Sequence, residues 1–393
     1  MADDRAAVFV VFALNGAVYG SWAPRVPAIA ERLNASPGLL GVALLCLTIG
    51  MLIAAAQSGR LVERCGARVA IVASTVLACA LLPLAGVAPS MPWFAVVMFS
   101  LGAAVGLLDV SMNIGAVAVE RRTRRPLMPV FHAGFSLGGL IASSAAGFAA
   151  AHQWTPLRHF LTADAVIVVA LVLVVRDLPK KVVRERVVTP ATRVAPVRRP
   201  VLWLLAAIAL LSAVAEGASA DWSALLLVST RGIGEGAAAL AYAGFSLMMA
   251  LTRLGGAWVQ RRLGATRTLA IGAVLAGGGL VLAAVVPGAA VAFAGFGLAG
   301  AGLAASFPIA LSLAGAAGRR ADETGGEREI AFVTTVAYSG FLVGPPMFGG
   351  VAQVTSLSTS FVVVGMLAVL IAPVAVCAGH ARHRELTAPT TVS

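Results

Sequence analysis

The chain contains twelve apolar runs, each long enough to cross a lipid bilayer as a helix. A membrane-spanning helix needs about 20 mostly apolar residues, and such runs recur along almost all of the 393 residues. Hydrophobic residues make up 59% of the chain and charged residues only 12%, so a water-soluble fold would have to expose much of this apolar surface. We therefore predict an all-α membrane protein with spans near 6–28, 37–58, 69–87, 92–119, 128–151, 159–176, 201–229, 237–258, 268–286, 289–317, 330–352 and 358–378.

The basic residues are concentrated in alternate loops between these spans. With the amino terminus placed in the cytoplasm, 24 of the 29 Lys and Arg residues fall on the cytoplasmic side. Cytoplasmic loops of membrane proteins carry such an excess of Lys and Arg, so the pattern predicts that both termini are cytoplasmic. This topology also explains the formal net charge of +12, and we predict no nucleic-acid partner.

A basic, proline-containing segment separates six spans from six. It reads RDLPKKVVRERVVTPATRVAPVRRP over residues 176–200 and is too polar to cross a membrane. Similar sequences recur on its two sides: NGAVYGSW and EGASADW, GLLDVSMNI and GLAASFPI, HAGFSLGG and YSGFLVGPP. Tandem halves of this kind are typical of a transporter architecture whose substrate site lies between the halves. We predict two pseudo-symmetric six-helix bundles, 1–178 and 201–380, joined by a linker at 179–200 and followed by a cytoplasmic tail at 381–393.

The loop between the second and third spans reads GRLVERCGAR, residues 59–68. It resembles the signature loop of the major facilitator superfamily, Gly-x-Leu-x-acid-Arg-x-Gly-x-Arg, with Glu where Asp is usual. The resemblance implies a gating loop that stabilises the state closed to the cytoplasm, although its arginines could instead only enforce topology. Its candidate residues are Gly59, Glu63, Arg64, Gly66 and Arg68.

Other motifs resemble subgroups within that superfamily. WAPRVP, DVSMN, FHAGFSLGG and EGASADWSA resemble sequences of a bacterial subgroup of MosC-type membrane proteins. LLDVSMN more distantly resembles the fourth span of fucose–proton symporters, but the carboxylate that those proteins use in the first span is missing here.

These resemblances imply secondary active, proton-coupled transport of a small organic solute across the bacterial inner membrane by alternating access. Efflux of a drug or metabolite by proton antiport is the alternative within transport. A non-transporting receptor that reuses the fold is the alternative outside it.

Three ionisable side chains within spans are candidates for proton coupling. An acid near the bilayer centre is costly and faces the bundle interior or water, and removal from water favours the protonated form of a carboxyl group. Asp109 is therefore predicted to bind and release the coupled proton, although it could be a hydrogen-bonded structural residue. Glu216 is the second candidate, and His132 could relay the proton or bond a neighbouring helix.

Polar and aromatic residues in the spans supply candidates for the substrate cavity: Asn15, Tyr19, Trp22, Asn113, Tyr242 and Tyr338. The first three form an i, i+4, i+7 stripe on one helix, which could contact a ligand or only pack, with Trp22 as an interfacial anchor. Charges that could form gates are Arg25 and Asp221 near the outer side and Arg253 near the inner side. Snorkelling and anion binding are the alternatives for Arg253.

The sequence carries no motif for ATP-driven pumping or for catalysis. A phosphate-binding loop with a Gly-rich Lys-Ser/Thr motif is missing, so transport has to use a gradient, and we predict that the protein is not an enzyme. The four cysteines have no metal-binding spacing. We expect no cofactor or metal; the expected partners are a small-molecule substrate, protons and the lipid bilayer, and the expected state is a monomer.

Overall fold

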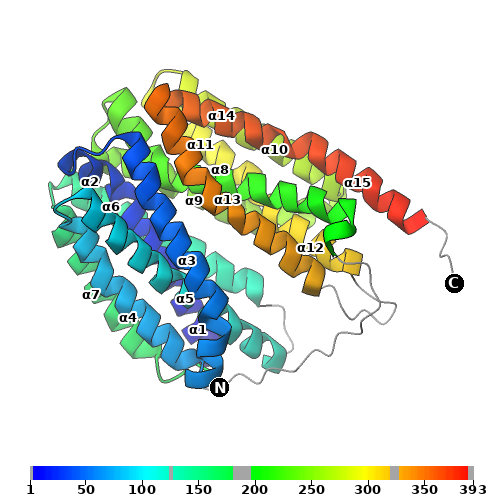
Figure 1. The fold of residues 1–393 in the computed structure, drawn as a ribbon, viewed down its shortest axis with the longest axis horizontal. Helices are drawn as coiled ribbons and strands as arrows, with labels where there is room; N and C mark the ends of the chain where they lie inside the picture. Colours follow the sequence, from blue (N-terminus) through cyan, green and yellow to red (C-terminus); the bar gives the residue numbers. More distant parts are fainter. Residues whose placement is uncertain (1–2, 124–126, 180–195, 319–326, 388–393) are drawn as a thin grey trace.

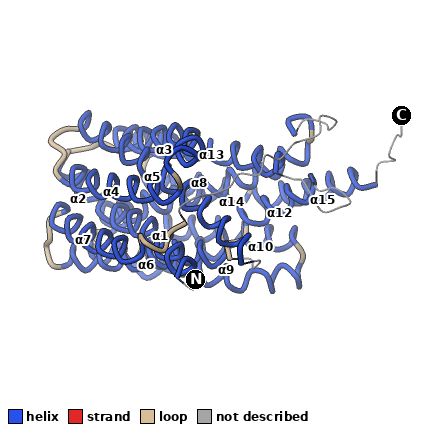
Figure 2. Tube along the Cα trace, turned by 90° about the horizontal axis from the view of Figure 1, so that it is seen from below, coloured by secondary structure: helices blue, strands red, loops and turns tan. Residues whose placement is uncertain are grey.

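The structure, a computed structural model, describes residues 3–123, 127–179, 196–318 and 327–387. In these ranges it consists of helices and connecting loops without a strand (Figure 2). Twelve helical segments are long and apolar enough to cross a membrane. The predicted all-α class with twelve spans is confirmed.

The helices form two bundles that follow the order of the sequence (Figure 1). The first bundle contains α1 (Asp3–Trp22), η1 (Ala23–Arg25), α2 (Val26–Arg32), α3 (Pro37–Cys65), α4 (Ala67–Gly86), α5 (Met91–Thr123), α6 (Met128–Ala151) and α7 (Pro156–Val174). The second contains η2 (Pro196–Arg198), α8 (Pro200–Arg231), α9 (Glu235–Leu263), α10 (Ala265–Val285), α11 (Ala289–Leu303), α12 (Ser306–Gly318), α13 (Glu327–Val354), α14 (Leu357–Val369) and α15 (Ile371–Thr387). Most of the predicted linker, residues 180–195, lies outside the described residues.

Glycines allow the helices of each bundle to approach closely. Gly102 on α5 lies so near Leu47 on α3 that a Cβ atom at Gly102 would overlap the backbone of Leu47. Gly300 on α11 lies in the same way against Phe245 on α9. Small residues have this role in membrane proteins because helix association there depends on close packing.

The two bundles repeat the same local structures. In each bundle a single glycine with positive φ forms the turn between two helices. Gly66 (φ 83°) separates α3 from α4, and Gly264 (φ 77°) separates α9 from α10. Arg32 donates to carbonyl groups at the end of α4, and Arg231 donates to the corresponding carbonyl groups at the end of α10. Carbonyl groups at a helix end have no donor within the helix and need one from elsewhere. In both bundles an arginine at the equivalent place supplies it.

Two of the predicted spans in the second bundle are broken where proline removes a backbone donor. The tenth span divides into α11 and α12 because Pro308 cannot donate to the carbonyl of Ala304. Arg253 Nε donates to that carbonyl instead, at 3.3 Å. The twelfth span divides at Leu370, ahead of Pro373, and then continues to Thr387, past the position where the sequence predicted the start of a tail.

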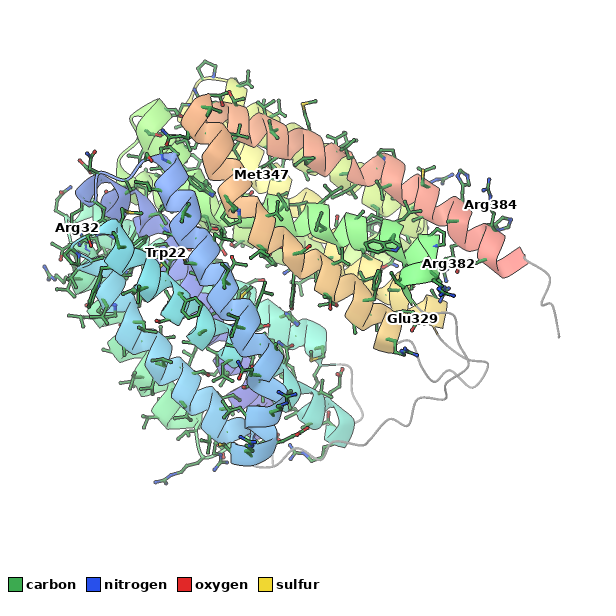
Figure 3. All side chains as sticks on the ribbon, viewed as in Figure 1. Trp22, Arg32, Glu329, Met347, Arg382 and Arg384 are labelled. Atoms are coloured by element: carbon green, nitrogen blue, oxygen red, sulfur yellow. The ribbon has the colours of Figure 1, made fainter. Side chains whose placement is uncertain are left out.

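The bundles contact each other at one end and diverge toward the other (Figure 1). At the closed end, α3 packs on α13 and α6 packs on α9; Gly38 N donates to Gln353 Oε1 at 3.2 Å. Trp22 and Arg32 lie toward this end, whereas Glu329, Arg382 and Arg384 lie at the divergent end (Figure 3). The described chain also begins and finishes at the divergent end.

Candidate functional site

Six polar side chains from both bundles come together near the middle of the spans. Tyr19 on α1 interacts electrostatically with Asp109 on α5, with Asp221 on α8 and with two tyrosines on α9 and α13. The tyrosine on α9 also interacts with Glu216. We call this set the midspan cluster: Tyr19, Asp109, Glu216, Asp221, Tyr242 and Tyr338.

The three acids of the midspan cluster have no basic partner. Among the described residues, none of Asp109, Glu216 and Asp221 forms an ion pair. Asn113 Nδ2 donates to the backbone carbonyl of Asp109 at 2.8 Å and lies 3.5 Å from Oδ1 of the Asp109 carboxylate. Because an unpaired carboxylate is costly inside a membrane, these groups have to be neutral, hydrated or bound to a cation.

The tyrosines of the cluster add an aromatic wall with contributions from both bundles. The Tyr19 hydroxyl lies 3.7 Å from Met51 Sδ, and the Tyr19 ring meets the Phe135 ring edge-on with centroids 5.9 Å apart. Tyr242 stacks on the next aromatic residue of its own helix, at 6.3 Å. Rings that carry hydroxyl groups can contact apolar parts of a solute and also hydrogen-bond to it.

Two of the predicted cavity residues lie in the core of the first bundle instead. Asn15 Nδ2 lies 3.6 Å from Met112 Sδ, and the Asn15 side chain is almost completely buried. Trp22 is 2% exposed and packs on Phe94 with centroids 5.7 Å apart. Of the stripe predicted on the first span, only Tyr19 therefore belongs to the midspan cluster.

His132 and Arg253 lie apart from the midspan carboxylates. His132 is an exposed residue early in α6, and its ring is 5.2 Å from that of Phe12. It interacts electrostatically with Arg253 of the other bundle. Arg253 also interacts with Tyr242, so these two residues lie between the cluster and the divergent end.

Arg25 joins the two bundles at the closed end. Its side chain is 2% exposed, and Nη1 lies 3.5 Å from Oε2 of Glu235 on α9. Nη2 donates to the carbonyl of Trp154, which lies between α6 and α7. Arg25 and Asp221 were both predicted as gate charges near the outer side, and the acid beside Arg25 is Glu235. We call Arg25, Trp154 and Glu235 the closed-end latch.

The predicted gating loop lies at the divergent end of the first bundle. Arg68 Nε donates to the carbonyl of Leu178 at 3.0 Å, and Arg68 Nη2 donates to the carbonyl of Arg176. Gly66 forms the turn, and Glu63 and Arg64 are exposed. Gly59 faces open space, since a Cβ atom added there would have no neighbour within 4 Å. The loop thus connects α4 to the chain that follows α7.

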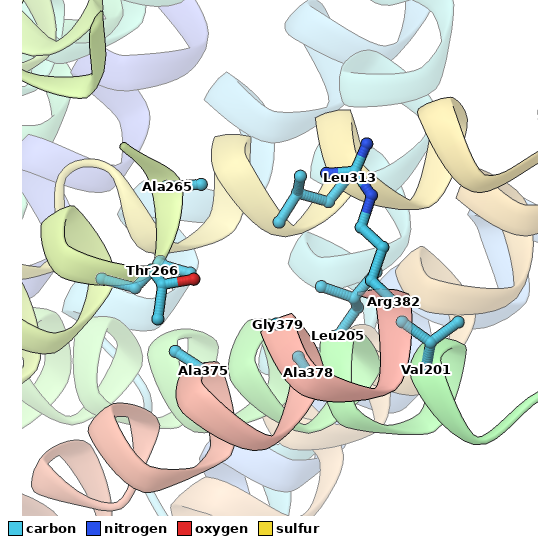
Figure 4. Close-up of a pocket in the computed structure, with 10 residues that line it drawn as sticks. Val201, Leu205, Ala265, Thr266, Leu313, Ala375, Ala378, Gly379 and Arg382 are labelled. Carbon is cyan, nitrogen blue, oxygen red and sulfur yellow. The ribbon is translucent and has the colours of Figure 1, made fainter. Parts of the chain in front are cut away.

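Among the described residues there is no group of His, Cys, Asp and Glu side chains that could hold a metal ion. A small cleft of about 50 Å³ lies between α8, α10, α12 and α15 at the divergent end of the second bundle (Figure 4). Binding sites for organic solutes measure about 300–1,000 Å³, so this cleft is too small to be the substrate site.

Relatives with known sequences match almost the full length of the chain. An uncharacterized MFS-type transporter of Yersinia pestis is 31% identical over 363 residues, 92% of each chain. The membrane protein MosC of Rhizobium meliloti is 29% identical and covers 96% of this chain and 90% of its own. The second match confirms the predicted similarity to MosC-type proteins.

Solved structures show the same fold at low sequence identity. The nucleoside transporter NupG superposes with a TM-score of 0.77 at 13% identity, covering 95% of this chain and 99% of its own. The fucose:proton symporter FucP of E. coli gives a TM-score of 0.62 at 16% identity, covering 95% and 98%. The sequence profile of the Major Facilitator Superfamily matches residues 8–326. The chain therefore belongs to the major facilitator superfamily, whose members are multi-pass membrane transporters of small molecules and not enzymes.

Proposed function

We propose that the protein is a proton-coupled secondary transporter that moves a small organic solute by alternating access. It would act as a monomer in a bacterial inner membrane with both termini in the cytoplasm. The observation that carries this proposal is the midspan cluster, in which acids of both bundles lie within the membrane spans without a basic partner. Membrane-embedded acids of this kind are typical of proton relays in transporters.

Asp109 is the proposed coupling residue. Asn113 supplies a hydrogen bond to its carboxylate, and Tyr338 of the opposite bundle lies within electrostatic range. A proton gained or lost by Asp109 therefore changes the interaction between the two bundles. Glu216 is the second coupling residue, and His132, nearer the divergent end, passes protons between the cluster and the cytoplasm.

Alternating access would come from rocking of the bundles, residues 1–178 and 201–380, about the midspan cluster. With cytoplasmic termini, the divergent end faces the cytoplasm, so this conformation is inward-facing. Opening to the outside then requires the Arg25–Glu235 contact of the latch to separate. The gating loop would contact the second bundle when the cytoplasmic end closes.

The test measures proton movement in liposomes that contain the purified protein and the pH dye pyranine. Sugars and polyols form one set of added solutes, and lipophilic cations form the other. Symport with an entering solute lowers the internal pH, whereas antiport raises it. We expect one solute class to change the pH through the native protein but not through Asp109→Asn.

Asp164→Asn is the matched control, because Asp164 is a buried acid on α7 outside the midspan cluster. It should leave the pH change intact. A pH change that survives Asp109→Asn at the native rate would contradict the proposed coupling. A solute that stabilises the protein without any flux would instead support the receptor alternative.

A further inference from the structure

The small cleft at the divergent end of the second bundle has a counterpart in the first bundle. Gly66 and Gly264, which form equivalent turns, are 198 positions apart. Gly102 and Gly300, which form equivalent close helix contacts, are separated by the same number of positions. The same shift relates Ile71 to Leu269 and Gly115 to Leu313. Leu269 and Leu313 both line the cleft, so Ile71 and Gly115 mark its counterpart.

In the first bundle the corresponding space is filled by the chain itself. After α7 ends, the chain turns and buries Leu178, which is 1% exposed. Pro179 and Ile71 both lie within 4.0 Å of a Cβ atom built on Gly115. Arg68 holds this segment in place through the Leu178 carbonyl. The first bundle therefore carries an apolar plug between α4 and α5.

In the second bundle no corresponding turn occurs, because α15 continues as a helix to Thr387. It presents small residues, Ala375, Ala378 and Gly379, to the cleft, and the other walls are apolar apart from Thr266 and Arg382 (Figure 4). One water molecule needs about 10–15 Å³ of such space. The cleft of about 50 Å³ can thus take a short stretch of alkyl chain.

The rim of the cleft is basic. Arg382 lines it and forms no ion pair within the described part of the chain. The nearby acid Glu385 is already paired with Arg199 at 2.5 Å, and Arg199 also lies 3.7 Å from Glu329. An occupant of this cleft therefore needs an apolar part for the walls and a negative charge for Arg382. The chain's own linker is strongly basic, so it does not supply the negative charge that an occupant needs.

We propose that the cleft binds an anionic phospholipid of the adjacent leaflet, with its phosphate on Arg382 and the Thr266 hydroxyl and its first methylenes against Leu269 and Leu313. The lipid takes the place that Leu178 and Pro179 fill in the first bundle. Arginines near a membrane surface bind anionic headgroups through this charge attraction. The site is distinct from the midspan cluster and does not depend on the identity of the transported solute.

Native mass spectrometry of the detergent-purified protein tests this proposal, with phosphatidylglycerol, phosphatidylcholine and inorganic phosphate as separate probes. Arg382→Gln removes the charge, and Ala378→Leu fills the cleft as Leu178 does in the first bundle. Arg384→Gln is the matched control, since Arg384 lies on the same helix but does not line the cleft. Thermal unfolding confirms that each variant is folded.

We expect phosphatidylglycerol to bind the native protein more tightly than phosphatidylcholine, with about fivefold weaker binding in Arg382→Gln. Ala378→Leu should lose the bound lipid, and Arg384→Gln should retain it. Native-like phosphatidylglycerol binding by Arg382→Gln would overturn the proposal even if Ala378→Leu failed to fold. Equal binding of the two lipids, or equally tight binding of inorganic phosphate, would also overturn it.

Discussion

Replacing Glu235 by Gln should open the closed end of the protein. Arg25 belongs to the first bundle and Glu235 to the second, and their charged atoms are 3.5 Å apart. The pair therefore stabilises only those conformations in which the bundles touch at this end. The substitution keeps the size of the side chain and removes its charge, so Arg25 loses the charge attraction to position 235 and keeps its bond to the Trp154 carbonyl.

The size of the effect follows from the separation and burial of the two charges. At 3.5 Å, two unit charges attract each other by about 5 kcal/mol in a medium of effective dielectric constant about 20. Desolvation of the buried guanidinium offsets part of this attraction. A net contribution of about 2 kcal/mol corresponds to an about thirtyfold change in the ratio of closed to open molecules at this end.

A disulfide across the closed end provides the assay. A Cβ atom built on Gly38 lies 3.6 Å from Cβ of Gln353, within the usual range of about 3.5–4.5 Å for disulfides. In a variant whose native cysteines are replaced by alanine, cysteines at 38 and 353 should crosslink rapidly on mild oxidation. Glu235→Gln should slow the crosslinking by up to about thirtyfold, in proportion to the loss of the closed state.

The matched control for this prediction is Glu31→Gln, which removes an exposed acid at the same end of the molecule. It should not slow the crosslinking, because Glu31 repels Glu235 of the other bundle and its neutralisation can only favour closure. An unchanged rate in Glu235→Gln would show that the ion pair contributes nothing to closure, contrary to this prediction.

Three further predictions test the site and the fold. Asp109→Asn should retain solute binding, measured by thermal shift, but lose solute-driven proton movement. A pH change as large as that of the native protein would contradict the coupling role of Asp109. Gly102→Leu should prevent accumulation of folded protein because its Cβ atom would overlap α3, whereas Gly59→Ala, with open space around it, should melt at the native temperature. Arg231→Gln should destabilise the protein by about 1–2 kcal/mol through loss of its bonds to the end of α10; an unchanged unfolding midpoint in denaturant would show that water replaces them.

The spans could be predicted from the sequence because the bilayer sets both their length and their composition. The repeat was visible in three pairs of similar segments, and the structure adds a further correspondence in Gly66 and Gly264, which both have positive φ. The acids of the midspan cluster were also recognisable, because a charged residue in an apolar run is conspicuous. Their lack of basic partners could be seen only in the structure.

The closed-end latch could not be predicted, since Arg25 and Glu235 are 210 residues apart and no local pattern relates them. The burial of Asn15 and Trp22 was also beyond the sequence. A polar stripe shows which residues share a helix face, but it does not show whether that face packs inside its own bundle or faces the other bundle. The break at Ala304 had a visible signal in Pro308, which removes a backbone donor.

The most direct test of proton-coupled alternating access is proton movement through the 38/353 cysteine variant in liposomes, measured before and after oxidation with a solute that the screen has identified. Alternating access requires the closed end to open in each cycle, so the disulfide should stop solute-driven proton movement and reduction should restore it. Undiminished proton movement through the fully crosslinked protein would show that transport does not require the closed end to open.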